Sequence, residues 1–302
     1  MSGALPRISI VTPCFNQAAY IAQTIESVLD QGYPELEYLI VDGGSTDGSA
    51  EIISRYADRL AWWTTEPDEG QVHALNKGFA RATGEVLAFI NSDDYYLPGA
   101  FDAIAKRWAA QPFDFCAGAC RHVDESGETL LVSAGTASSL TDFLDLDRYK
   151  RDYLTQPEVF WSARAFRALG GFDESYHLAF DYEYWVRAAA AGLGFCHIDR
   201  ELACFRRHGA QKTQGSMDGV CEDVRVVETA IAAVDLPPTD RTRVRAGLRH
   251  YRSWAQYEAA KAALGERRYG EAAAAFGRAL GESPGYTLGR TARRLVGRTD
   301  GL

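Results

Sequence analysis

The sequence contains no apolar run long enough to cross a lipid bilayer. A membrane-spanning helix needs about 20 consecutive, mostly apolar residues. The first apolar run, Ile8–Val11, also follows too short a leader for a secretory signal peptide. We therefore expect a cytoplasmic protein.

Cysteine is sparse as well, with six residues that lack the density of a disulfide framework. Several lie in apolar, strand-like surroundings, which is typical of reduced cysteines in the cytosol. Cys116, Cys120 and His122 are close in sequence, but their spacing differs from that of paired zinc motifs and no fourth ligand is evident. We therefore expect neither a disulfide scaffold nor a zinc site.

An excess of positive charge is missing too, since the formal net charge is −9. Residues 241–302 carry 13 Lys and Arg against 5 Asp and Glu, a balance of +8, while the first 240 carry 19 against 36, a balance of −17. The acidic body argues against a nucleic-acid partner. The basic tail suits either a solvated helical face or a contact with a membrane or acidic surface.

Over the first 110 residues, short runs rich in β-branched residues alternate with segments of helical periodicity. The expected strands are 8–12, 38–41, 60–64 and 86–90, and the expected helices are 19–30, 49–58, 70–82 and 99–110. This alternation predicts an α/β fold with a doubly wound, mostly parallel sheet, whose ligands bind beyond the carboxyl ends of the strands. Thr12-Pro13, Asp42–Gly44 and Asn91–Asp94 fall at such ends, so we expect them to share one crevice.

The alternation stops after residue 113. Strands are expected at 114–119 and 120–132 with a turn at Glu125–Gly127, which predicts a mixed or antiparallel extension of the sheet. A helix at 180–191 and a strand at 194–205 follow. Pro237-Pro238 marks a boundary, so we expect a catalytic domain at 1–235 and an α-helical C-terminal extension at 236–302.

The extension resembles one tetratricopeptide-type helix pair, on the segments 259–264 and 269–284. One such repeat cannot bury its own apolar face, so we expect it to pack on the catalytic domain or to form a homodimer. Its basic helices suggest peripheral docking on the inner membrane face. The residues considered for this docking are Arg290, Arg293, Arg294 and Arg298, around Leu288, Leu295 and Val296.

The run Phe89–Asp94 ends an apolar strand in one amide, one hydroxyl and two carboxylates. Such oxygen ligands suit Mg²⁺ or Mn²⁺, ions that share their coordination sphere with substrate phosphates. The alternative is a polar loop with an Asp cap for the helix that starts near Leu97. The other polar strand ends favour the metal hypothesis.

Three motifs, in this order and spacing, resemble the inverting glycosyltransferase family 2. They are Ile10–Asn16, Val41–Ser49 and Asn91–Asp94, with further matches at Asp68–Gln71, Ala74–Gly78 and Gly170–Glu174. The resemblance implies the GT-A fold, with a nucleotide-binding half and an acceptor half. It also implies a nucleoside-diphosphate-sugar donor, for which UDP is favoured over GDP and dTDP, and a Mn²⁺ or Mg²⁺ ion.

The resemblance implies that Asp42 accepts a ring N–H of the base, while Gly43 and Gly44 let the backbone turn closely beneath it. The alternative for Asp42 is a turn residue that caps the next helix. The other residues implied to line the nucleoside pocket are Thr12, Pro13 and Asn16.

On the third helix, Gln71 and Asn76 are expected to fix the donor. Lys77 is expected to offer charge to the diphosphate, with a plain solvated lysine as the alternative.

Asn91-Ser92-Asp93 stands where the family carries its Asp-x-Asp metal motif, so Asn91 replaces the first acid and lowers the charge of the site. Asp93 is therefore the expected direct metal ligand, and Asp94 the expected supporting contact to donor or metal.

The segment 204–213 resembles one that closes over the donor in several family members. It implies His208 as a second metal ligand and Arg206 as compensation for leaving-group charge.

The family's general base is an Asp at a helix start, and Asp181 matches it, with Phe180 in place of the preceding Glu. A carboxylate there is suited to deprotonating an acceptor hydroxyl. A simple helix cap is the alternative for Asp181, and Glu183 is the nearest rival as base.

These features indicate a metal-dependent, inverting hexosyltransferase-type enzyme that acts on a glycan or lipid-linked acceptor in bacterial surface polysaccharide assembly. One alternative is a sugar-phosphate nucleotidyltransferase, but a Gly-rich basic loop is expected after its first strand, where this chain has Pro13–Gln17. Another is a non-catalytic nucleotide-sugar or glycan-binding module, with its helical tail docking a partner and Asn91 and Phe180 marking lost activity.

Overall fold

The computed structural model describes residues 5–150, 153–212 and 217–295. The chain folds into two compact units, one of residues 1–138 and 152–214 and one of residues 139–151 and 215–302. The second unit thus contains 139–151 and the segment before residue 236, in addition to the expected extension.

The first half of the first unit is a parallel sheet. Its strands, in the spatial order β3-β2-β1-β4, are Trp62–Thr65, Leu36–Asp42, Ile8–Cys14 and Val86–Phe89. β1 and β4 are buried at every position, which suits a sheet with helices on both faces. The doubly wound, mostly parallel prediction for this half is therefore confirmed.

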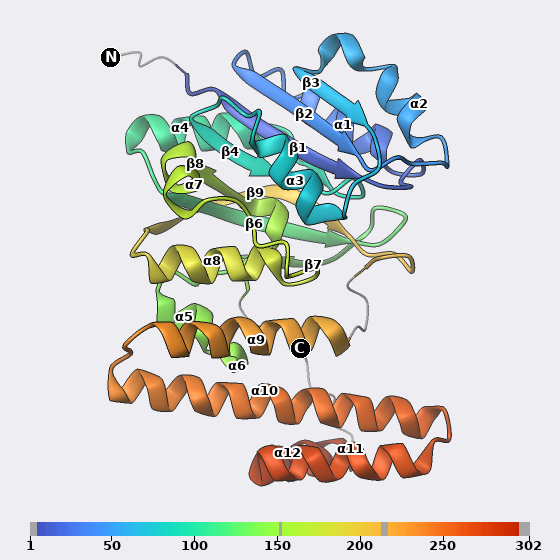
Figure 1. The fold of residues 1–302 in the computed structure, drawn as a ribbon, viewed down its shortest axis with the longest axis vertical. Helices are drawn as coiled ribbons and strands as arrows, with labels where there is room; N and C mark the ends of the chain where they lie inside the picture. The colour runs from blue at the N-terminus through green and yellow to red at the C-terminus, as the bar shows by residue number, and fades with distance from the viewer. Residues whose placement is uncertain (1–4, 151–152, 213–216, 296–302) are drawn as a thin grey trace. The chain divides into compact units, whose positions relative to one another are not determined.

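Helices cover both faces of this sheet (Figure 1). α3 (Gln71–Phe79) lies on the near face, and α4 (Ala100–Ala110) lies on the far face. The connecting elements are α1 (Ile21–Leu29), α2 (Ser49–Ser54) and the 3₁₀ turn η1 (Ala57–Arg59).

The sheet continues from β4 in the order β8-β6-β9-β5, with β7 paired to β6. These strands are β5 (Tyr95–Tyr96), β6 (Phe115–Val123), β7 (Thr129–Ser133), β8 (Val159–Ser162) and β9 (Phe195–Arg206). β8 is antiparallel to both β4 and β6, whereas β6 and β9 are parallel, so the sheet is mixed as expected.

The expected strand boundaries in this half are wrong, because residues 115–123 form one strand and the next is short. The turn begins at Asp124, whose side chain accepts hydrogen bonds from the backbone N–H groups of Ser126 and Glu128. The remaining elements of this half are η2 (Gln156–Glu158), α7 (Ala163–Leu169) and α8 (Phe180–Ala190).

An aromatic core anchors α8 against the sheet. Trp161 and Trp185 are fully buried, with ring centroids 5.8 Å apart. Phe180 is the first residue of α8. The centroid of its ring lies 5.8 Å from that of Phe89 in β4 and 5.6 Å from that of Phe172. These contacts fix the start of α8 beside the carboxyl end of β4.

The second unit is helical. It contains α5 (Leu140–Leu144), α6 (Leu146–Tyr149), α9 (Met217–Ala233), α10 (Pro238–Gly265), α11 (Tyr269–Glu282) and α12 (Pro284–Leu295). α10 and α11 lie side by side (Figure 1), and their tetratricopeptide type stays a prediction.

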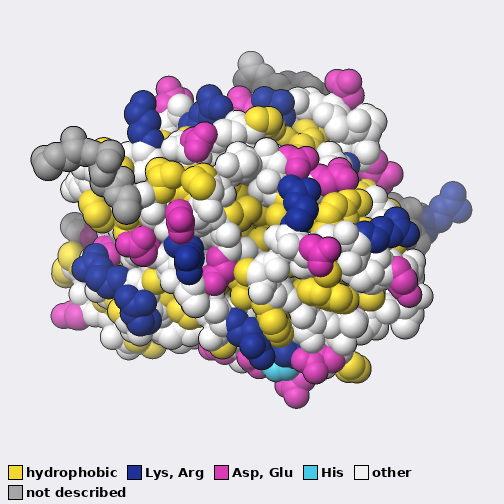
Figure 2. Space-filling model, turned by 90° about the horizontal axis from the view of Figure 1, so that it is seen from above, with side chains coloured by type: hydrophobic (Ala, Val, Ile, Leu, Met, Phe, Trp, Pro, Cys, Tyr) yellow, Lys and Arg dark blue, Asp and Glu magenta, His cyan; other side chains and the backbone are white. Residues whose placement is uncertain are grey.

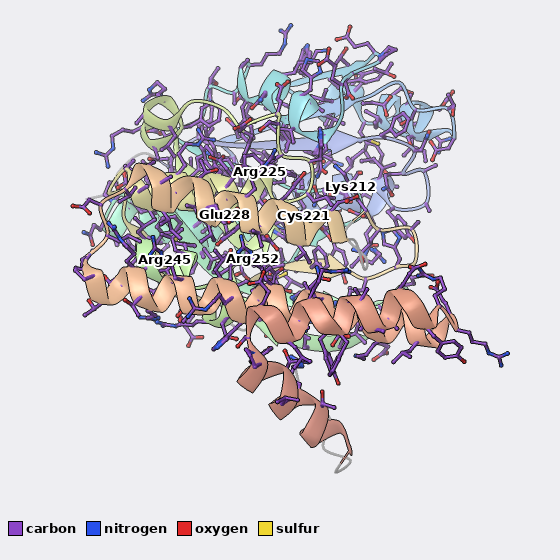
Figure 3. All side chains as sticks on the ribbon, turned by 60° about the horizontal axis from the view of Figure 1, so that its bottom comes forward. Lys212, Cys221, Arg225, Glu228, Arg245 and Arg252 are labelled. Carbon is purple, nitrogen blue, oxygen red and sulfur yellow. The ribbon has the colours of Figure 1, made fainter. Side chains whose placement is uncertain are left out.

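Polar contacts, some of them buried, join the helices of this unit. Asp223 of α9 accepts a hydrogen bond of 2.6 Å from the Tyr251 hydroxyl of α10 and pairs with Lys150 Nζ at 2.8 Å. Glu228 of α9 and Arg252 of α10 form an ion pair, and both are labelled in Figure 3.

The expected basic docking face is only partly described. Arg290 is 9% exposed and donates to the Tyr286 hydroxyl at 3.0 Å, so it lies inside the unit rather than on a surface that meets lipid. The side chains considered at 293–298 lie outside the described part of the chain.

Across the described residues, no helix combines the length and the apolar character that a membrane span requires. On the face shown in Figure 2, Lys and Arg alternate with Asp and Glu. That face therefore lacks a single-sign field of the kind that draws nucleic acid.

Gly78 tests how closely α3 packs on β1. A Cβ at this position would lie 2.4 Å from Val11 Cγ1, so we expect Gly78→Ala to lower the free energy of unfolding by about 1–3 kcal/mol. Calorimetric unfolding would measure this change. Gly277→Ala is the control, because a Cβ in that α11 position meets nothing within 4 Å. It is expected to stabilise its helix by about 0.5–1 kcal/mol, and equal effects at both sites would contradict the packing argument.

Candidate functional site

Asp42 lies at the carboxyl end of β2, where its carboxylate is enclosed by its own turn. Oδ2 accepts the backbone N–H groups of Gly44 (3.2 Å) and Ser45 (3.0 Å) and the Thr65 hydroxyl (2.6 Å). Oδ1 accepts the Ser45 hydroxyl at 2.5 Å, and Asp42 has no exposed surface. The geometry therefore fits a turn residue, but Asp42 does not cap the next helix, because the Ser49 N–H at the start of α2 donates to Asp47 Oδ1 at 3.0 Å.

The neighbouring end of β1 presents a different set of groups from the one expected. Thr12 has no exposed surface, and its hydroxyl lies 3.0 Å from the Tyr38 hydroxyl. Pro13 is buried as well. Phe15 is 61% exposed, and Asn16 follows it with a φ of 54°.

Asn16 joins the ends of β1 and β2. Its side-chain oxygen accepts the Thr46 N–H at 2.9 Å, and its own N–H donates to the Ser45 hydroxyl at 2.7 Å. The exposed Phe15 ring is thereby held next to the Asp42 turn.

Asp68 closes over the same turn. A Cβ on Gly43 would lie 2.8 Å from Asp68 Oδ2, so glycine lets the Asp68 carboxylate approach this closely. Gly44 has a φ of +83° and packs on Pro67. Asp68 Oδ1 accepts the Gly70 N–H at 2.8 Å, which leaves Oδ2 beside the turn.

The three expected residues of α3 have different environments. Gln71 donates from Nε2 to Asn91 Oδ1 at 2.7 Å and so joins the strand-end cluster. Asn76 instead accepts the N–H of Phe172 and donates to its carbonyl oxygen, each at 2.9 Å. Lys77 forms an ion pair with Glu66. Asn76 and Lys77 are thus engaged within the protein.

Asn91 is the centre of an amide network at the end of β4. Besides accepting from Gln71, it donates from Nδ2 to Gln156 Oε1 (3.3 Å) and to Asp94 Oδ2 (3.4 Å). Gln156 donates in turn to the Phe89 carbonyl oxygen at 2.7 Å. Ser92 is buried, and its carbonyl oxygen accepts the Thr24 hydroxyl at 2.9 Å.

Asp93 and His208 come together from β4 and from the segment after β9. Asp93 Oδ2 lies 3.0 Å from His208 Nε2. Two neighbouring ligands on an octahedral ion with bonds of about 2.1 Å are separated by about 3.0 Å. The pair therefore fits a divalent ion whose remaining ligands come from phosphates and water, as is usual for Mg²⁺ and Mn²⁺.

Protein ligands alone would not enclose such an ion. Among the residues that the structure describes, no group of three or more His, Cys, Asp or Glu side chains is arranged to hold a metal. The His208 side chain is 2% exposed, and its Nδ1 has no hydrogen-bond partner. The ring is therefore held through Nε2 and by the Tyr20 ring, whose centroid lies 4.7 Å from that of His208. An unpaired buried atom such as Nδ1 is rare in folded proteins.

Asp94 is a buried link between β4 and β9. Its Oδ1 accepts the Arg206 backbone N–H at 2.9 Å. Burial raises the pKa of Asp94 well above its usual value, and the charge of Asp93 adds to this shift, while the Arg206 N–H opposes it. Asp94 therefore holds the loop that carries Asp93.

The Arg206 guanidinium supports the same loop. It donates to the Asp93 carbonyl oxygen at 3.0 Å and to Gln23. It also lies over the rings of Tyr20 and Tyr95, 5.0 and 5.3 Å from their centroids. Arg206 is 5% exposed, so its charge is used inside the unit.

Asp181 is the second residue of α8 and is half-buried. Its neighbour Phe180 packs on Phe89, four residues before Asp93, which puts the helix start at the same strand end. Glu183, the rival base, receives two hydrogen bonds of 2.8 Å from Arg187.

Sequence patterns gave Phe15 and Asp68 no role of their own, although both lie in motifs that carry the family resemblance. Phe15 follows a strand end directly, and Asp68 follows β3, so their positions were the available signals. From the sequence, Gln156 is a candidate sugar contact, with a turn residue as the alternative. Its contacts with Phe89 and Asn91 were not predictable, because they cross more than 60 residues of sequence.

Replacing Asp42 by Asn tests its role in the turn. The change removes the charge that three donors share at Oδ2, so we expect Asp42→Asn to lower the free energy of unfolding by about 1–3 kcal/mol without any ligand. Denaturant titration would measure this loss. Asp68→Asn is the matched control, and its cost is expected to stay below about 0.5 kcal/mol because Asp68 is half-exposed and Asn keeps the bond to Gly70. A stable Asp42→Asn protein would contradict the turn role.

Known proteins resemble this chain in sequence. Residues 9–167 match the family described as Glycosyl transferase family 2. A stretch of 97 residues is 40% identical to the putative teichuronic acid biosynthesis glycosyltransferase TuaG of Bacillus subtilis, and it covers 31% of this chain and 38% of that protein.

Solved structures share the fold. TarS 1–349 of S. aureus, in complex with UDP-GlcNAc, superimposes with a TM-score of 0.63 at 18% identity, covering 81% of this chain and 71% of that one. The mannosyltransferase PcManGT from Pyrobaculum calidifontis, in complex with GDP-Man and Mn²⁺, gives 0.61 at 22% identity, covering 96% and 80%. The expected GT-A fold with C-terminal helices is confirmed. Since the family match spans more than half of the residues, this chain belongs to glycosyl transferase family 2.

Proposed function

We propose that this glycosyltransferase moves a sugar from a nucleoside-diphosphate sugar to an acceptor hydroxyl with inversion at the anomeric carbon. The observation that carries the proposal is the Asp93–His208 pair, 3.0 Å apart at the carboxyl end of β4. Asp181 lies in the helix that packs against the same strand. A metal-binding pair and a separate carboxylate are the two parts that a single displacement needs.

The nucleoside would bind at the ends of β1 and β2. Phe15 offers an exposed ring for a flat base, and Asp68 Oδ2 offers an acceptor for a base N–H next to Gly43. A uracil ring supplies such an N–H, so UDP is the favoured nucleotide, with GDP and dTDP as alternatives. TarS in complex with UDP-GlcNAc supports this choice.

Asp93 and His208 would hold Mn²⁺ or Mg²⁺, which would neutralise the diphosphate as the sugar leaves. The complex of PcManGT with Mn²⁺ supports this assignment. Asn91 and Gln71 fix the strand end from which Asp93 projects, and Asp94 and Arg206 hold the loop behind it.

The transfer itself requires one base. As the acceptor oxygen attacks the anomeric carbon, Asp181 would take the hydroxyl proton, and the bond from the anomeric carbon to the diphosphate oxygen would break. The electron pair of that bond leaves with the nucleoside diphosphate, so no covalent sugar-protein species forms. The hydroxyl loses its proton only in the transition state, where a positioned carboxylate lowers the barrier.

The acceptor would be a glycan or a lipid-linked glycan in bacterial polysaccharide assembly at the cytoplasmic side of the membrane. The similarity to a protein of teichuronic acid biosynthesis supports this class. The chain spans 38% of that relative, so the comparison extends to the shared segment only.

Metal-dependent nucleotide binding is the first test. We expect UDP with Mn²⁺ to raise the melting temperature, since a ligand at a hundredfold excess over its Kd adds about 2.7 kcal/mol to the stability of the folded state. EDTA should remove the metal-dependent part, and so should Asp93→Asn and His208→Gln. Asp102→Asn, at an exposed α4 position, is the control and should keep the full shift. A shift in wild type that ignores EDTA would rule out the metal assignment.

The base assignment predicts a loss of rate without a loss of binding. Asp181→Asn should lower kcat by about 10²–10⁴-fold, as is usual for removal of a general base, while the Kd of UDP with Mn²⁺ stays unchanged. Release of UDP from the sugar donor, followed with acceptor present, measures the rate.

Glu183→Gln is the comparison for this experiment. Because Glu183 pairs with Arg187, Glu183→Gln should lower the free energy of unfolding. Its effect on kcat should be much smaller than that of Asp181→Asn. A full rate in Asp181→Asn would remove Asp181 as the base. Absence of UDP release by wild type with every sugar donor would favour a binding module instead.

A further inference from the structure

Arg207 is an exposed cation next to a proposed metal ligand. It follows the last residue of β9 and directly precedes His208. Unlike Arg206, whose guanidinium is buried among Gln23, Tyr20 and Tyr95, Arg207 is open to solvent. The two neighbouring arginines therefore have different roles in the fold.

The exposed guanidinium is nevertheless held in place. Its Nη2 lies 3.3 Å from Nδ1 of His122, and the Tyr153 side chain also forms a hydrogen bond with Arg207. The backbone N–H of Arg207 donates to the Val123 carbonyl oxygen at 2.8 Å. A long side chain that is fixed at several points loses less entropy when it binds a ligand.

His122 is suited to accept from a cation because it is neutral. It has no exposed surface, and burial, with the charge of Arg207 as a second cause, lowers its pKa to about 4. Its Nε2 lies 3.1 Å from the Ser133 hydroxyl and 3.4 Å from the Thr155 hydroxyl. With a proton on Nε2 donated to Ser133, the lone pair of Nδ1 faces Arg207.

No carboxylate neutralises Arg207 within the described part of the chain, where no Asp or Glu oxygen lies within ion-pair distance of its guanidinium. The nearby acid Glu125 instead accepts the Gly209 N–H at 3.3 Å. An ordered guanidinium without a counter-charge is a site for an anion.

The cluster is connected to the proposed donor site through the chain. Thr155 is followed by Gln156, which bonds to Asn91 at the end of β4, and Arg207 is followed by His208. Thr155 and Arg207 thus each directly precede a residue of the proposed donor site.

We propose that Arg207 binds a phosphate oxygen of a substrate and that His122 is the positioning residue that presents it. The inference rests on the proposed transferase function and assigns a cation that differs from Arg206. The phosphate belongs either to the donor diphosphate or to the diphosphate of a lipid-linked acceptor.

Binding measurements on the full-length protein distinguish the two sources. With Mn²⁺ present, Arg207→Ala should weaken UDP binding by roughly ten- to a hundredfold, the usual loss for a charged hydrogen bond, and leave uridine binding unchanged. If the acceptor supplies the phosphate, Arg207→Ala should bind UDP as wild type does. Its affinity for a water-soluble prenyl diphosphate should then fall by the same factor. Arg207→Lys should retain part of either affinity, since it keeps the charge without the fork geometry.

The role of His122 is tested through Arg207. His122→Phe should reproduce the Arg207→Ala loss, whereas His122→Asn, which keeps an acceptor near the Nδ1 position, should recover part of the affinity. The double variant His122→Phe with Arg207→Ala should lose no more than Arg207→Ala alone. Arg167→Ala, at an exposed position of α7, is the control and should bind both ligands normally.

Two results would overturn the inference in distinguishable ways. If Arg207→Ala binds both UDP and the prenyl diphosphate with wild-type affinity, Arg207 does not bind the phosphate. The proposed function would be unaffected by that result. Failure of wild type itself to bind either ligand with Mn²⁺ would remove both proposals.

Discussion

The hydrogen bond between Asp94 Oδ1 and the Arg206 backbone N–H is the contact on which the site depends. It joins the turn after β4 to the end of β9, across more than 100 residues of sequence. Asp93 and His208 lie beside these two points and meet at 3.0 Å as a result. Because Asp94 is buried, the bond forms where competition from water is weak. The site is therefore positioned by the sheet, and the flexible side chains of a loop contribute little to its geometry.

The buried aromatic rings behind the sheet provide the second constraint. Phe89 ends β4, and its ring contacts Phe172 and Phe180, so the start of α8 is fixed by close packing of hydrocarbon. The Asn76 amide adds a polar clamp, since it bonds to both backbone groups of Phe172. This arrangement explains the sequence departure at residue 180. A Glu there would place a charge beside the Phe89 and Phe172 rings, whose centroids lie 5.6 Å apart, whereas Phe completes the packing.

Sequence patterns predicted the parallel half of the sheet because β-branched runs and helical periodicity are local signals. They also predicted that Asp42, Asn91 and Asp93 lie at strand ends, since the sense of parallel strands fixes that edge. Which side chains face the crevice was not predictable, because it depends on contacts between distant segments. Thr12 bonds to Tyr38 inside the core, and Arg206 bonds to Gln23 across 183 residues. Short elements such as β5 and β8 were missed because runs of two and four residues are too short to show the alternation that identifies a strand, although their residues favour strands.

The replacement of the first metal-motif acid by Asn91 is consistent with an active site once the surrounding groups are considered. Its Nδ2 donates to Gln156 Oε1 and Asp94 Oδ2, which are both acceptors, while its Oδ1 accepts from Gln71. A carboxylate at this position would face an acceptor on one side and a buried carboxyl group on the other, and burial already raises the pKa of Asp94. The amide removes that repulsion and concentrates the negative charge on Asp93. In the proposed function, one carboxylate and one imidazole would leave most of the coordination sphere of the ion to phosphate oxygens, so we expect the affinity for the ion to rise when the diphosphate binds with it. On that proposal, the substitution would couple metal binding to donor binding.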